Sequence, residues 1–253
     1  MNIPVIKFHK MLLEENVDLI QKAFFGDNSK LNFYNYVIKM FPKLSYIDEE
    51  KLSKEIILQK IKSVVIESYY NNVNEIEKSL IEYNKIWHKY NNKYMATISE
   101  YLNIEWPEKI KTINVNIGII PFFPRYLDTF SFSLCPNLKK EMFMKIIAHE
   151  VLHFIWFEKW MELYPNTKKY ELESPYKVWE YSEMVTDCII NSSKVSSIYK
   201  FNEKSYDYFY EIKNENVYLM DKIKEIFNSN DTIENKIKKG YTYYLNFKRW
   251  KIY

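Results

Sequence analysis

One stretch decides the fold of this chain: Met142-Phe-Met-Lys-Ile-Ile-Ala-His-Glu-Val-Leu-His-Phe-Ile-Trp-Phe157. Apolar residues occur on nearly every side of this segment, which is typical of a helix buried in the body of a protein. Pro136-Asn137 supplies a helix-start signal and Pro165 a stop signal. The sequence therefore predicts a long buried helix between these two points.

The same helix contains His149-Glu150-Val-Leu-His153, which has the form HExxH. Two histidines four residues apart lie on one helical face, so both imidazoles can reach the same metal ion. Zinc accepts nitrogen ligands and keeps a position for water when the protein supplies three ligands. Glu150 lies next to His149 and can take a proton from that water. The alternative is a pair of core histidines, but buried polar groups need a partner such as a metal.

The third zinc ligand is not given by HExxH itself. The longer metzincin pattern HExxHxxGxxH requires Gly at position 156 and His at position 159, where this chain has Trp156 and Lys159. No histidine follows His153. A carboxylate, a cysteine or a histidine from the N-terminal side must therefore complete the site.

A second helix with acidic residues is predicted from Ser174 to Ile190, with Ser174 as N-cap and Pro175 at the first helical position. Glu180, Glu183 and Asp187 fall on one stripe of this helix. Such a stripe is an ordinary solvated face in most helices. Here it follows the HExxH helix after a short loop, so it is the candidate source of the third ligand.

In this respect the chain resembles the gluzincin metallopeptidases, in which HExxH is followed on a second helix by ExxxD. The match is Glu183-Met-Val-Thr-Asp187, and the resemblance covers about residues 111–190. It implies that Glu183 is the third zinc ligand, beside His149 and His153, with one Zn²⁺ per chain. It also implies that Asp187 accepts a hydrogen bond from a zinc histidine, most simply His149, as a second-shell residue.

The resemblance implies peptide-bond hydrolysis, with Glu150 as general base and a peptide or protein as substrate. Glu180 is the rival third ligand, although position 184, four residues later, is not acidic. The family uses a late His or Tyr to stabilise the oxyanion. Since no late histidine exists, a tyrosine is expected, with Tyr243 and Tyr244 as candidates.

Two alternating segments precede the HExxH helix. Residues 113–119 and 130–134 alternate apolar with small or polar residues, as half-buried strands do. The proline-containing link from Pro121 to Asp128 makes an antiparallel pair plausible. In gluzincins a strand at this place forms the sheet edge that binds extended peptide, so residues 128–134 are read either as that edge or as a structural strand.

The rest of the chain is predicted to be mainly helical. Residues 1–105 form a helical N-terminal region, and residues 106–253 form a zincin-like catalytic region. Helical patterns resume after Ser193 and end in an aromatic tail. The expected fold class is α+β and predominantly helical, with a small antiparallel sheet packed against a zinc-binding helix pair.

The composition excludes several classes of function. Three glycines among 253 residues leave no phosphate-binding loop, and only two arginines with a net charge of +3 argue against a nucleic-acid partner. We see no signal peptide and no apolar segment long enough to span a membrane. Cys135 and Cys188 are expected to be reduced core residues, which favours a cytoplasmic location. The oligomeric state is not indicated.

Two other functions remain open. A deformylase-like amidohydrolase would use HExxH with a cysteine ligand from an EGCLS-type segment, a pattern that the sequence around Cys135 lacks. A non-catalytic regulatory or interaction protein stabilised by zinc is the main alternative. The presence of Glu150 argues against it, because a structural zinc site needs no base.

Overall fold

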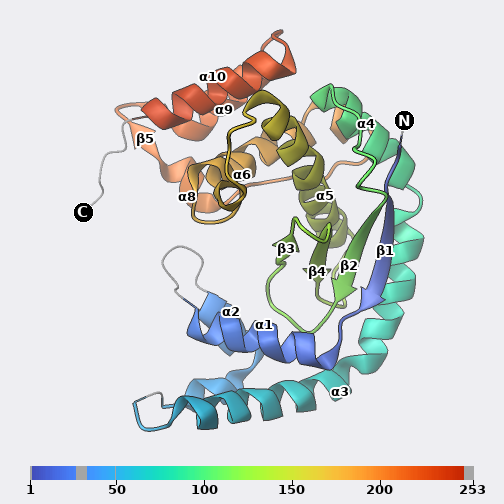
Figure 1. The fold of residues 1–253 in the computed structure, drawn as a ribbon, viewed down its shortest axis with the longest axis vertical. Coiled ribbons are helices and arrows are strands. Elements are labelled where there is room, and N and C mark those ends of the chain that lie inside the picture. The colour runs from blue at the N-terminus through green and yellow to red at the C-terminus, as the bar shows by residue number, and fades with distance from the viewer. Residues whose placement is uncertain (1, 27–32, 49, 248–253) are drawn as a thin grey trace. The chain divides into compact units, whose positions relative to one another are not determined.

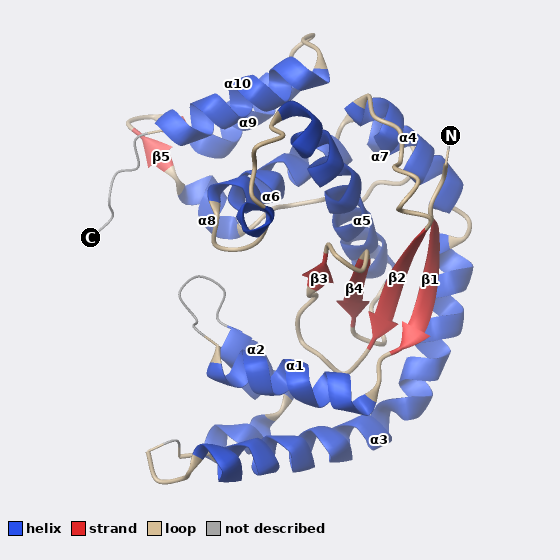
Figure 2. Cartoon of the chain, viewed as in Figure 1, coloured by secondary structure: helices blue, strands red, loops and turns tan. Residues whose placement is uncertain are grey.

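A computed structural model describes residues 2–26, 33–48 and 50–247 of the chain. The protein is predominantly helical with a small mixed sheet, which agrees with the predicted α+β class (Figures 1 and 2). Its internal contacts divide it into two compact units. We call them the sheet unit (Val5–His88 and Thr112–Lys139) and the helical unit (Met1–Pro4, Lys89–Lys111 and Lys140–Tyr253).

The two units do not follow the predicted boundary between residues 105 and 106. Each unit combines stretches from both sides of that boundary, since the chain leaves the sheet unit after His88 and returns to it at Thr112. All candidate metal ligands belong to the helical unit. In the described ranges, with their gaps at 27–32 and 49, no helix has the length and apolar character needed to cross a bilayer.

The sheet unit contains a four-stranded sheet in the order β1-β2-β4-β3. Its strands are β1 (Val5–Lys10), β2 (Thr112–Ile117), β3 (Arg125–Tyr126) and β4 (Ser131–Leu134). Its helices are α1 (Leu13–Phe25), α2 (Phe33–Met40), the 3-10 helix η1 (Pro42–Tyr46) and α3 (Lys54–Trp87). Strand β1 corrects the prediction that residues 1–105 are helical throughout. Six residues are too few to separate a two-residue period from the helical pattern that follows them.

The predicted antiparallel pairing of the two later strands is wrong. Strand β2 pairs with β4 in parallel, with Asn114 opposite Ser131, while β3 pairs antiparallel with β4. Parallel strands need a long connection, and residues 118–130 provide one that includes β3. The short strand β3 therefore covers Ser131 and Phe132, and the N–H of Ser133 bonds to the carbonyl of Pro124, so this part of residues 128–134 is not the free sheet edge that was one of the two predicted readings.

The alternation predicted for β2 is confirmed by its burial. Ile113, Val115 and Ile117 are fully buried, whereas the intervening side chains are partly exposed. Helix α3 packs against β1 and β2, and its Tyr83 ring lies 6.4 Å from that of Phe8 in β1. The sheet unit thus has an apolar core between one sheet face and a long helix.

Gly118, directly after β2, allows a close approach that a side chain would block. A Cβ atom there would lie 2.4 Å from Oδ1 of Asn16 and 2.6 Å from the sulfur of Met11. Oδ1 of Asn16 accepts the backbone N–H of Ile119 at 2.8 Å, and Asn16 is fully buried. The absence of a side chain at position 118 therefore preserves a buried hydrogen bond.

We predict that Gly118→Ala lowers the free energy of unfolding by about 1–3 kcal/mol, because overpacking displaces Asn16 from Ile119. Chemical denaturation of the purified variant would measure this. Thr112→Ala is a matched control at the other end of β2, where the side chain is only half-buried, and it should cost less. Equal stability of Gly118→Ala and the unchanged protein would contradict the prediction.

The helical unit contains the two helices that carry the candidate site, α5 (Lys140–Leu163) and α6 (Lys177–Ile190). Around them lie α4 (Asn91–Leu102), the 3-10 helix η2 (Lys169–Leu172), α7 (Ser193–Ser196), α8 (Asp207–Glu211), α9 (Leu219–Asn228) and α10 (Ile233–Asn246). A short hairpin of β5 (Lys213–Asn214) and β6 (Val217–Tyr218) separates α8 from α9.

The ends of the two site helices differ in how well the sequence predicted them. Helix α5 lies between its predicted start and stop signals. Helix α6 begins three residues after Ser174, because the extended residue Tyr176 is the N-cap and its carbonyl accepts the N–H of Glu180 at 2.9 Å. The predicted N-cap at Ser174 is therefore wrong.

Candidate metal centre

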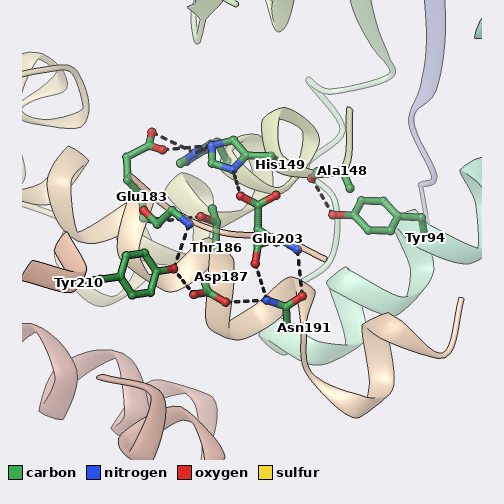
Figure 3. A network of polar contacts seen from close by, with 11 residues as sticks. Tyr94, Ala148, His149, Glu183, Thr186, Asp187, Asn191, Glu203 and Tyr210 are labelled. Carbon is green, nitrogen blue, oxygen red and sulfur yellow. Dashed lines mark hydrogen bonds and ion pairs between the residues drawn. The ribbon is translucent and has the colours of Figure 1, made fainter. Parts of the chain in front are cut away.

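Helix α5 places both HExxH histidines on one face, as their spacing predicts. His153 is completely buried, and the His149 side chain is 16% exposed. The two ring centroids lie 4.7 Å apart, and His153 stacks on Phe157 one turn later at 5.6 Å. The helix is anchored just before His149, where the hydroxyl of Tyr94 in α4 donates to the carbonyl of Ala148 at 2.7 Å (Figure 3).

Helix α6 brings its three acidic residues into the interior rather than to a solvated face. Glu180, Glu183 and Asp187 are between 2% and 3% exposed. A buried carboxylate is costly unless it is paired or hydrogen-bonded. The alternative of an ordinary solvated stripe is therefore excluded, and each of these carboxylates must have a partner.

Glu183 is the acid that meets the two histidines. Its Oε2 lies 3.1 Å from Nε2 of His149, and its Oε1 lies 3.2 Å from Nε2 of His153. The two Nε2 atoms are themselves 3.0 Å apart. Three possible ligand atoms from two helices thus converge on one small volume.

The distances in this cluster fit a zinc ion. Zinc binds histidine nitrogen at about 2.0–2.1 Å and carboxylate oxygen at about 2.0–2.2 Å, so tetrahedral ligand atoms lie about 3.3–3.5 Å apart. The two Nε2 atoms are 3.0 Å apart, and each lies 3.1–3.2 Å from a different oxygen of Glu183, so the donor atoms are about as close together as zinc ligands are. Two imidazoles with one carboxylate also form a donor set that is common in catalytic zinc sites. The residues present therefore suit the metal that the sequence predicts.

The electrostatics of the cluster favour a positive charge at its centre. Burial lowers the pKa of His149, but the carboxylates of Glu183 and Glu203 outweigh burial and raise this pKa well above its usual value. Burial likewise raises the pKa of Glu183, yet His153 and His149 hold it well below the usual value. A divalent cation at the centre would be stabilised by the same carboxylates.

Glu180, the rival third ligand, has a different partner. The hydroxyl of Tyr244 in α10 donates to its Oε2. Tyr243, the other predicted oxyanion candidate, packs its ring 5.6 Å from that of Phe247. The structure thus brings Glu183 to the histidines, while Tyr244 bonds to Glu180 and Tyr243 packs against the end of α10.

Asp187 does not make the contact with His149 that the resemblance implies. Its carboxylate instead accepts from Nδ2 of Asn191 at 2.5 Å and from the hydroxyl of Tyr210 (Figure 3). It also pairs with Nζ of Lys224 at 2.8 Å. The expected role of Asp187 as the direct acceptor is therefore corrected. Its side chain points along α6 toward the next turn rather than toward α5.

Glu203 takes the position predicted for Asp187. Its Oε1 lies 3.2 Å from Nδ1 of His149, and the residue is 6% exposed. Glu203 was not among the predicted site residues, because Asn202-Glu203-Lys204 is indistinguishable in sequence from a solvated loop. Glu150, the predicted base, lies on α5 between the two histidines and is 7% exposed.

A scan against protein-family models and searches of curated proteins and solved structures found no match to this chain.

Proposed function

We propose that this protein is a zinc-dependent metallopeptidase of the gluzincin type, with a zincin-like catalytic region. The observation that carries the proposal is the convergence of His149, His153 and Glu183, whose facing atoms are 3.0–3.2 Å apart in a mostly buried site. The order along the chain, HExxH on α5 and the carboxylate on the following helix α6, supports the gluzincin type in particular.

Each residue has a distinct role in this proposal. His149, His153 and Glu183 would hold one zinc ion per chain. When bound, zinc would supply Lewis acidity for the scissile carbonyl and for the attacking water. Glu150 accepts a proton from that water and passes it to the leaving nitrogen.

The chemistry of the third ligand argues against a deformylase-like enzyme. That class uses a cysteine thiolate, whereas the third group at this cluster is a carboxylate. Cys135 belongs to the sheet unit, where its carbonyl accepts from Tyr83 at 3.0 Å. Both cysteines are free thiols, which supports a reducing compartment such as the cytoplasm as part of the proposal.

The test is a metal and cleavage assay on the purified 253-residue chain. We expect about one zinc per chain, cleavage of casein or of a peptide library, loss of cleavage after chelation, and recovery when zinc is restored. A folded, unchelated sample with almost no zinc would contradict the metal site. Zinc bound without any peptide cleavage would instead favour the non-catalytic, zinc-stabilised alternative.

A further inference from the structure

Both ring nitrogens of His149 are engaged from opposite sides. Nε2 faces Oε2 of Glu183 at 3.1 Å, and Nδ1 faces Oε1 of Glu203 at 3.2 Å. A carboxylate accepts only, so Nδ1 must donate to Glu203. A metal ion at the cluster would take the place of the proton on Nε2, which faces Glu183 and His153, while Nδ1 keeps its proton for Glu203. Glu203 therefore selects the tautomer of His149 that can bind a metal.

The second oxygen of the Glu203 carboxylate shows how this residue is placed relative to the cluster. This atom, Oε2, is buried without a hydrogen-bond partner within the part of the chain that the structure describes. A buried carboxylate of this kind is destabilising unless positive charge lies nearby. The cluster beyond His149 is where such charge would lie, so the position of Glu203 is explained by the cluster rather than by local folding.

Asn191 holds the backbone of Glu203 at this position. Nδ2 of Asn191 donates to the carbonyl of Glu203 at 2.8 Å, and Oδ1 of Asn191 accepts the N–H of Glu203 at 3.0 Å (Figure 3). Glu203 lies in the segment between α7 and α8, where regular structure offers no such bonds. One amide side chain at the end of α6 therefore fixes the loop residue that faces His149.

Asp187 determines which way the Asn191 amide points. Its Oδ1 lies 2.5 Å from Nδ2 of Asn191, and because a carboxylate cannot donate, the NH₂ group must face Asp187. Oδ1 of Asn191 is then left for the N–H of Glu203. Tyr210 and Lys224 in turn hold Asp187. Residues 183, 187 and 191 follow one another by one turn along the same face of α6.

We propose that Glu203 is the positioning residue for His149, and that Asp187 acts on the site indirectly, through Asn191 and the backbone of Glu203. This inference rests on the proposed metal site. It differs from the direct contact between Asp187 and a zinc histidine that the ExxxD resemblance implies. Replacing Glu203 should therefore weaken zinc binding more than replacing Asp187 does.

The experiment is a competitive chelator titration that measures zinc affinity in the full chain. We expect Glu203→Ala to lose about 10- to 100-fold in affinity. Glu203→Gln should lose less, because its amide oxygen can still accept from Nδ1 of His149. Asp187→Asn should fall between the unchanged protein and Glu203→Ala, since it weakens only the support of Glu203. Glu211→Gln, on the exposed end of α8, is a matched control and should bind normally.

Several outcomes overturn this inference. One is a folded Glu203→Ala whose zinc affinity is within about twofold of that of the unchanged protein. Another is a larger loss of zinc affinity in Asp187→Asn than in Glu203→Ala. If Glu203→Ala fails to fold, Glu203→Leu decides, because leucine keeps much of the side-chain volume but cannot accept from Nδ1: affinity equal to that of Glu211→Gln would refute the role, and a loss would support it. Zinc binding by the unchanged protein is the separate test of the proposed function. Normal binding there with no effect at Glu203 would contradict this inference alone.

Discussion

Glu150→Gln should reduce peptide cleavage by about 10²- to 10⁴-fold, which is the usual contribution of a general base, while retaining one zinc per chain. The substitution keeps the size of the buried side chain and removes its ability to accept a proton. The two histidines on either side of it remain in place, so metal binding should not change.

The measurement combines the rate of cleavage of a peptide substrate with the zinc content of the same sample. Glu141→Gln is the matched control, since it makes the same chemical change on the exposed first turn of the same helix. It should cleave at the normal rate. Unchanged cleavage by a zinc-loaded Glu150→Gln would falsify the role of Glu150 as base.

Glu183→Ala should lose zinc binding, with a larger loss of affinity than the roughly 10- to 100-fold typical of outer residues. Glu183 is the carboxylate that contacts both histidines, at 3.1 and 3.2 Å. Its removal also leaves His149 and His153 without their shared anion, so two ligands alone would have to hold the ion.

Glu180→Gln is the informative comparison, because Glu180 is equally buried and lies one turn earlier on the same helix. Its partner is the hydroxyl of Tyr244, and a glutamine oxygen can accept the same bond. We therefore expect normal zinc affinity in Glu180→Gln by chelator competition. A weaker binder at position 180 than at position 183 would move the ligand assignment by one helical turn.

The predictions from the sequence succeeded where helical periodicity was sufficient. The extent of α5, the shared face of His149 and His153, and the approach of Glu183 to them follow from spacing along two helices and a resemblance. The burial of alternate residues in β2 could likewise be predicted, because side chains alternate between the two faces of any strand.

The pairing of strands that are distant in the sequence could not be predicted from such local patterns. Strand β1 and the parallel direction of β4 depend on which residues meet across the sheet, and the alternation within a strand is the same for either direction. The predicted antiparallel pair failed for this reason. The division into two units, each assembled from separated stretches, also arises from contacts rather than from local pattern.

The candidate metal centre also separates what local periodicity predicts from what long-range contacts decide, here for single side chains. The sequence by itself placed His149 and His153 on one helical face, whereas the choice of Glu183 over Glu180 came from the resemblance to gluzincins. Only the tertiary structure decided that Glu203 faces His149 and that Asp187 turns to Asn191. The physical reason is that a loop carboxylate has no periodicity, and its partner is set by long-range packing that brings residues 54 positions apart to 3.2 Å.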